Sequence, residues 1–132
     1  MLIYIIGKIS DPNPVDYLRH VAVGNAVFCY LLKQGHSPYW GGMDACAILS
    51  NSFVGDGTSM VKLLQKNSIE WLKKADCCVA MPTAPFSKGS KKEIEVAQEL
   101  GIPVLSYETY DELDAKLAEY EKSRVFPIYK ID

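Results

Sequence analysis

The sequence lacks an apolar segment long enough to cross a membrane. Its N-terminal stretch "MLIYIIGK" is apolar but short, has no basic residues before it, and ends at Gly7-Lys8. It is too brief for a membrane span or for the core of a signal peptide. We therefore expect a cytoplasmic protein without a membrane partner, and we interpret this stretch as a first β-strand that is buried on both faces.

A strong charge of either sign is also missing. The net charge is −2, the isoelectric point is near 5.7, and the fourteen basic residues form no block. Binding to a nucleic acid polymer normally needs a basic patch, so this class of partner is not expected. A nucleotide-sized anion is still compatible with the composition.

Cysteine and histidine are too few and too scattered for a metal site. The four cysteines are Cys29, Cys46, Cys77 and Cys78; they form no C-x-x-C pair, and neither histidine lies at ligand spacing from them. We therefore predict no zinc site and no cofactor. Core packing is the expected role of Cys29, in a helical run, and of Cys77 and Cys78, in a strand-like run.

Apolar runs typical of strands alternate with helical patterns along the chain. With 132 residues, 48% of them hydrophobic, one domain spanning residues 1–132 is expected. The alternation predicts an α/β protein with a parallel sheet. We expect a three-layer, flavodoxin-like arrangement with strand order 2-1-3-4-5 and helices on both faces. The predicted strands are 2–6, 37–40, 77–81, 102–106 and 126–131.

Four helices are predicted between these strands. The first begins at Pro14, with Asn13 as its cap, and stops before Gly35. The others are expected at 58–75, 90–101 and 110–123, and the segment 41–57 is expected to be an irregular, lid-like part with a short helix at 45–50. The first helix has a predicted buried stripe with a period near 3.6 residues, made of Leu18, Val21, Asn25, Phe28 and Leu32.

Two loops follow the strands at the predicted switch point of the sheet. Parallel sheets of this order bind ligands beyond the carboxyl ends of the strands, between strands 1 and 3, which selects residues 7–12 and 82–90. The second loop leads into a helix N-terminus through Ser87, Lys88, Gly89 and Ser90. Such a place favours a phosphate or a carboxylate, although the Walker pattern is absent. Phosphate binding and plain helix capping are equally open on composition.

Glu93 has two interpretations. With Ser90 it forms an S-x-x-E pattern, in which Glu93 would cap the helix and contribute about 1 kcal/mol. It is also a carboxylate at the mouth of the predicted switch point, where it can serve as a nucleophile or a base. Periodicity alone favours the capping interpretation.

Several short segments, in this order and spacing, resemble the nucleoside 2-deoxyribosyltransferase superfamily, which includes 2′-deoxynucleoside 5′-monophosphate N-glycosidases. A fourth segment is similar to the first helix of related uncharacterised members. The resemblance covers residues 1–107, with an interruption at 41–57. The matching segments are "YIIGKIS" (4–10), "EWLKKADCCVA" (70–80) and "SKGSKKEIEVAQELGIPV" (87–104), and the fourth is "NAVFCYLLKQGH" (25–36).

The resemblance implies a double displacement at C1′ of a 2′-deoxyribose. Glu93 matches the nucleophile and Tyr4 matches the tyrosine that orients it. Gly7 would let the substrate approach the first loop, and a serine at position 87 is typical of the monophosphate hydrolases. The resemblance also implies a homo-oligomer and a small-molecule nucleoside or nucleotide as partner. The residues implied for binding the substrate or its phosphate are Gly7, Ile9, Ser10, Ser87, Lys88, Gly89 and Ser90.

The main departure from the family is Ser68. The family has an aspartate there, which serves the departing base, and a serine cannot protonate a base at neutral pH. Ser68 and Asn25, polar residues in predicted buried stripes, are possible site residues, but a buried helical serine can simply bond back to the preceding turn. Asp44 and Asp56 are possible substitutes for the missing acid. Asp76 precedes a strand and should lie at the opposite end of the sheet.

Aromatic side chains add candidates for stacking on a base. Tyr17, Tyr39 and Trp40 are the three considered, although exposure or core packing is favoured for each of them taken singly. Two functions remain open at this stage. The first is an N-glycosidase or deoxyribosyltransferase that uses Glu93, and the second is a non-catalytic module that binds a nucleotide or a nucleotide-derived signal.

Overall fold

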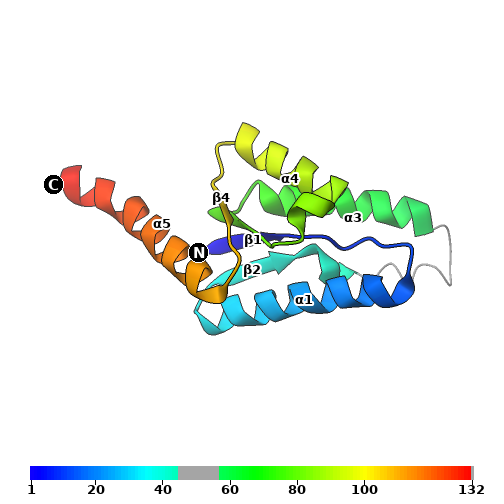
Figure 1. Ribbon diagram of the computed structural model, residues 1–132. Coiled ribbons are helices and arrows are strands. Elements are labelled where there is room, and N and C mark those ends of the chain that lie inside the picture. The colour runs from blue at the N-terminus through cyan, green and yellow to red at the C-terminus, as the bar shows by residue number, and fades with distance from the viewer. Residues whose placement is uncertain (45–56, 132) are drawn as a thin grey trace.

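The computed structural model describes residues 1–44 and 57–131. Four strands form one parallel sheet in the order β2-β1-β3-β4 (Figure 1). This confirms the α/β class and the 2-1-3-4 part of the expected order. The central strand β1 pairs with both β2 and β3, so that Tyr4 lies between Tyr39 and Cys78. The strands are β1 (Leu2–Ile6), β2 (Ser37–Trp40), β3 (Cys77–Ala80) and β4 (Val104–Ser106).

The fifth strand expected at 126–131 is wrong. Helix α5 (Tyr110–Ile131) begins at the predicted residue and continues through this segment (Figure 1). A short apolar run does not by itself distinguish a strand from a helical segment, and no turn signal separates it from the helix before it. The expected short helix at 45–50 lies outside the described residues, and residues 41–44 form a 3₁₀ helix, η1 (Gly41–Asp44).

Helix α1 (Pro14–Lys33) begins and ends as predicted. The Asn13 side chain accepts hydrogen bonds from the backbone N–H groups of Val15, at 2.8 Å, and Asp16, at 3.3 Å. Gly35 follows the last turn with a φ of 89°, a left-handed conformation that favours glycine. Both ends of this helix were therefore readable from local sequence chemistry.

The predicted buried stripe of α1 is wrong by about one residue. The buried positions are Gly24, Val27 and Leu31, whereas Asn25 is exposed, as are Leu18 and Leu32. The Trp40 side chain sets this rotation: a Cβ atom on Gly24 would lie 1.9 Å from Trp40 Cε2, so the helix must present a glycine to the indole. The same rotation exposes Cys29, which corrects its expected core role, while Cys77 and Cys78 are buried as expected.

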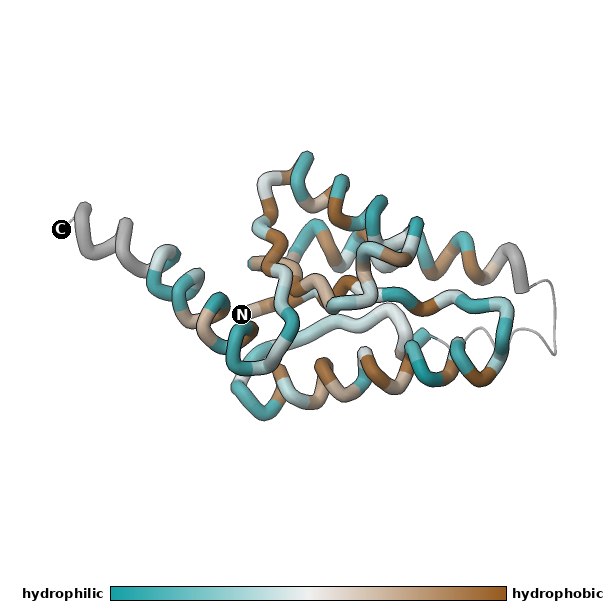
Figure 2. The backbone as a smooth tube through the Cα atoms, viewed as in Figure 1, coloured by the Kyte–Doolittle hydropathy of each residue, from teal (hydrophilic) through white to brown (hydrophobic). Residues whose placement is uncertain are grey.

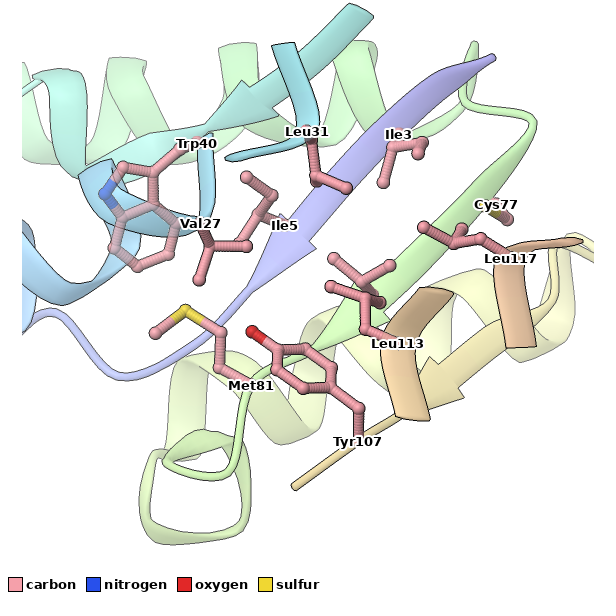
Figure 3. Packing of buried hydrophobic residues seen from close by; sticks show 11 residues of the cluster. Ile3, Ile5, Val27, Leu31, Trp40, Cys77, Met81, Tyr107, Leu113 and Leu117 are labelled. Carbon is pink, nitrogen blue, oxygen red and sulfur yellow. The ribbon is translucent and has the colours of Figure 1, made fainter. Parts of the chain in front are cut away.

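Two clusters of buried side chains cover the sheet. Ile3 and Ile5 of β1 belong to one cluster, with α1 and α5, and Figure 3 shows Trp40 beside Val27 at one side and Leu117 beside Cys77 at the other. Tyr4 and Ile6 belong to the second cluster, to which helices α3 (Gly57–Leu72) and α4 (Lys88–Glu99) contribute Leu72 and Ala97. Because successive strand residues point to opposite faces, Tyr4 points toward α3 and α4.

Hydrophobic and hydrophilic residues alternate along the helices, as expected for helices with one buried face (Figure 2). None of the described helices has the length and apolar character needed to cross a membrane.

Candidate functional site

The loops that follow β1 and β3 meet at the carboxyl edge of the sheet. The backbone N–H of Lys8 donates a hydrogen bond to Thr83 Oγ1 at 3.1 Å. Gly7 lies so close to Met81 that an added Cβ would be 2.7 Å from the methionine sulfur. These contacts bring together the two loops that the switch-point rule selects. Thr83 was not singled out from the sequence, although its place directly after β3 was an available signal.

Glu93 does not cap helix α4. The helix begins at Lys88, three residues before the start that a cap at Ser90 would give. Its N-terminal cap is Ser87, whose Oγ accepts a hydrogen bond from the Ser90 N–H at 3.2 Å. The capping box predicted for Ser90 and Glu93 is therefore wrong. The Glu93 carboxylate instead accepts a hydrogen bond from the Tyr4 hydroxyl, which comes from the centre of the sheet.

Burial controls the protonation of the Tyr4–Glu93 pair. Tyr4 is 2% exposed, and its burial, together with the Glu93 charge, raises the pKa of its hydroxyl well above the usual range. Burial also raises the pKa of Glu93 to about 7, although the hydrogen bond from Tyr4 opposes the rise. Tyr4 thus stays a hydrogen-bond donor, and Glu93 exchanges its proton near neutral pH. A carboxyl with this pKa suits acid, base or nucleophilic chemistry.

The first turn of α4 lies five residues or fewer before Glu93 and carries the predicted phosphate-binding residues. Ser87 is partly buried, and Lys88 and Gly89 are exposed. Ser90 is 1% exposed, and its hydroxyl has no hydrogen-bond partner among the described residues. An anionic ligand could therefore meet this turn at its exposed start, Lys88 and Gly89, where a helix N-terminus favours negative charge.

Ser68 connects the site to a second carboxyl group. Its hydroxyl donates to the Leu64 carbonyl oxygen at 2.9 Å, which is the back-bond expected for a helical serine. It also lies 3.3 Å from the Tyr39 hydroxyl, which donates to Asp44 Oδ2 at 3.2 Å. Burial raises the pKa of Asp44, against the lowering effect of the Tyr39 hydrogen bond. Asp44 therefore reaches Ser68 through one intervening hydroxyl.

Tyr39 lies beside Tyr4 in the site. The two rings stack with centroids 5.4 Å apart, and Trp71 stacks on the other side of Tyr39 at 5.7 Å. Tyr39 thus already stacks on two aromatic side chains of the protein itself. Trp40, another stacking candidate, is buried against α1 and its indole N–H donates to the Val21 carbonyl oxygen at 3.2 Å, so core packing, the role that the sequence favoured for it, is confirmed.

The remaining predicted residues are divided between the site and other regions. Ile9 and Ser68 both lie near Gly41: a Cβ on this glycine would be 3.6 Å from Ile9 Cδ1 and 3.7 Å from Ser68 Oγ. Ser10 is exposed in the first loop, and Asn25 is exposed along α1.

The other acidic candidates lie elsewhere or outside the described residues. Asp76 lies at the opposite edge of the sheet, as predicted, where its Oδ2 accepts from the Leu2 N–H at 2.8 Å. Asp56 lies outside the described residues. No group of three or more His, Cys, Asp or Glu side chains within residues 1–44 and 57–131 is arranged to hold a metal ion.

No protein-family model and no curated protein matches the sequence.

Proposed function

We propose that the protein cleaves or transfers the N-glycosidic bond of a 2′-deoxynucleoside or of its 5′-monophosphate, with Glu93 as the nucleophile. The observation that carries this proposal is the hydrogen bond from Tyr4 to Glu93, which turns the carboxylate toward the sheet and away from the helix backbone. Ligands of parallel α/β sheets bind beyond the carboxyl ends of the strands, where the loops after β1 and β3 meet. The proposal agrees with the residues on which the family resemblance rests.

In the proposed reaction an oxygen of the ionised Glu93 attacks C1′ as the bond from C1′ to the base nitrogen breaks. The base leaves with one added proton, and the sugar stays on Glu93 as an ester. Water then attacks C1′ in hydrolysis, or a second base does so in transfer, and Glu93 is released as a carboxylate. Dividing one displacement into two is the logic of retaining glycosidases.

Tyr4 has a positioning role in this reaction. Its hydroxyl donates to Oε2 of Glu93 and, because of its raised pKa, does not ionise near neutral pH. The tyrosine therefore fixes one carboxylate oxygen and leaves the other for attack. Nucleophiles held in one orientation react faster because little freedom is lost at the transition state.

The phosphate of a 5′-monophosphate is proposed to bind at the first turn of α4. Support comes from the N-terminus of α4, where Ser87 is the cap and where Lys88 and Gly89 are exposed in the first turn. The first loop, with Gly7, Ile9 and Ser10, would cover the sugar, since its backbone is tied to Thr83.

The proposal includes the finer features of the fold and assembly: a three-layer, flavodoxin-like arrangement and a homo-oligomer in the cytoplasm. The two clusters of buried residues on the sheet support the layered arrangement. Support for an oligomer comes from large apolar side chains that α3 exposes, Leu63 and Trp71.

Base release measures the proposed activity directly. The protein is incubated with each 2′-deoxynucleoside and 5′-monophosphate, and the free base is quantified by chromatography. We expect release by the wild type, none by Glu93→Ala, and full release by Glu95→Ala, which removes an exposed carboxylate from the same helix. Undiminished release by Glu93→Ala, or none from any substrate by the wild type, contradicts the proposal.

A non-catalytic nucleotide-binding module is the second candidate. The observation that favours it is Ser68, whose hydroxyl is no acid and already donates to Leu64. Calorimetric binding of a nucleotide that persists in Glu93→Gln, with no base release by the wild type, would establish this alternative. Lowered affinity in Lys88→Ala and Lys91→Ala would then locate its phosphate.

A further inference from the structure

Two neighbouring tyrosines of the sheet each contact one carboxyl group. Tyr4 and Tyr39 are register partners on β1 and β2 with stacked rings. The Tyr4 hydroxyl donates to Glu93, and the Tyr39 hydroxyl donates to Asp44. The proposed mechanism uses only the first of these pairs, and it leaves the proton of the departing base without a source.

We infer that Asp44 supplies this proton to the departing base through the hydroxyl groups of Tyr39 and Ser68. The inference rests on the proposed function and deepens it. It replaces the acid that is missing at position 68 with one that the 3₁₀ helix η1 presents from the end of β2. Asp44 acts through its neighbours and does not contact the base, so Ser68 is the group that touches the substrate.

The hydrogen bonds permit two arrangements of the same three groups. With Asp44 protonated, its carboxyl donates to Tyr39, Tyr39 donates to Ser68, and the Ser68 hydrogen is free to bond to Leu64 or to a base nitrogen. With Asp44 ionised, Tyr39 donates to Asp44 at 3.2 Å, and the single Ser68 hydrogen bonds either to the Leu64 carbonyl oxygen, at 2.9 Å, or to the Tyr39 oxygen, at 3.3 Å. Each hydroxyl is both donor and acceptor, as such a transfer requires.

The transfer balances in protons and electrons. Asp44 gives its proton to the Tyr39 oxygen, Tyr39 gives its own to the Ser68 oxygen, and Ser68 gives its own to the base nitrogen, which keeps the electron pair of the broken C1′–N bond. Glu93 supplies the pair for the new C1′–O bond. In the second displacement, a proton from the attacking water or base returns along the same path to Asp44.

The surroundings of the relay keep its members in place. Tyr39 is held between the rings of Tyr4 and Trp71, and the Ser68 back-bond fixes that serine on α3. Within residues 1–44 and 57–131, the further groups near Asp44 and Tyr39 are Tyr17 from α1 and Asn67 from α3, neither of which is charged near neutral pH. Burial raises the pKa of Asp44, which favours the protonated form that the transfer needs.

Leaving-group dependence separates a proton donor from a structural residue. A substrate that the wild type cleaves is compared at pH 6 with a counterpart whose base is already cationic, 7-methylguanine for a purine or 3-methylcytosine for a pyrimidine. A cationic base leaves without being protonated. Asp44→Asn should lower kcat for the unmodified substrate by about 10²–10⁴-fold and for the methylated one by less than about fivefold.

Two further variants keep the test sharp if Asp44→Asn is unstable. Tyr39→Phe retains the aromatic ring and leaves Asp44 in place but removes the hydroxyl between Asp44 and Ser68. Ser68→Ala removes the last donor of the relay. Both variants should therefore lose kcat on the unmodified substrate and keep it on the methylated one. Asp111→Asn, an exposed carboxylate on α5, is the matched control and should act as the wild type does on both substrates. Thermal melting of every variant monitors folding.

The possible failures are distinguishable. The relay is overturned if the variants lose kcat equally on the unmodified and the methylated substrate, or if Asp44→Asn and Tyr39→Phe lose none. In both cases base release by the wild type still upholds the proposed function. If the wild type releases no base from any substrate, methylated ones included, the proposed function fails and the relay fails with it.

Discussion

At the scale of single residues, the environment of Glu93 disfavours its own charge. Burial removes water from the carboxylate, and the single hydrogen bond from Tyr4 recovers only part of that loss, so the pKa rises from 4.5 to about 7. Such a group stabilises the fold most when it is protonated. Its stabilisation is fully present below pH 4.5 and is lost as the pH rises through about 7.

Glu93→Gln should remove this dependence on pH. A neutral amide at position 93 still accepts from Tyr4 but never ionises, so the free energy of unfolding should exceed that of the wild type by roughly 1–3 kcal/mol at pH 8 and match it at pH 4.5. Urea titrations at both pH values measure the difference. Glu95→Gln is the control, and its free energy of unfolding should change with pH as that of the wild type does. If the free energy of unfolding of Glu93→Gln also changes with pH as in the wild type, the burial of Glu93 is contradicted.

At the scale of elements, the start of α4 decides what Glu93 can do. Ser87 and Ser90 are three residues apart, and either is an acceptable N-terminal cap by its chemistry. Because Ser87 is the one used, Ser90 lies inside the first turn and Glu93 lies in the second, beyond reach of the cap. The sequence pattern S-x-x-E was present without the capping box that it usually indicates.

Replacing each serine by alanine distinguishes the two possible caps. Ser87→Ala should lower the free energy of unfolding by about 1 kcal/mol, since the Ser90 N–H loses its acceptor. Ser90→Ala should be neutral or slightly stabilising, because it removes a buried hydroxyl that has no partner among the described residues. Thermal or chemical unfolding of the two variants measures which substitution destabilises the protein more. A larger loss in Ser90→Ala than in Ser87→Ala would place the cap at Ser90.

Local chemistry made the ends of elements more predictable than their faces. Asn13, Pro14 and Gly35 fixed the limits of α1, because caps and left-handed turns depend on a few adjacent residues. The buried face of α1 depends on the contact of Gly24 with Trp40, which lies on another element. The spacing of apolar residues within the helix gives no information about that contact. For the same reason the partner of Glu93 could not be read from the helix that carries it.

At the scale of the whole molecule, the parallel sheet assembles the site from distant segments. The order β2-β1-β3-β4 places Tyr39 and Tyr4 side by side and ties the loops after β1 and β3 through Lys8 and Thr83. The meeting of these two loops was predictable, since the switch-point rule depends only on strand order. The contact of Asp44 with Tyr39 was not, because it depends on the turn of η1 directly after β2.

The central claim is that this assembly presents Glu93 for attack on C1′ of a 2′-deoxyribose. The most direct measurement is peptide mass spectrometry after the protein, mixed with saturating substrate, is quenched rapidly in acid. We expect a 2-deoxyribosyl group, or its 5-phosphate, bound to Glu93 in the wild type and to no residue in Glu93→Gln. A sugar attached to a different residue, in protein that releases base, would contradict it.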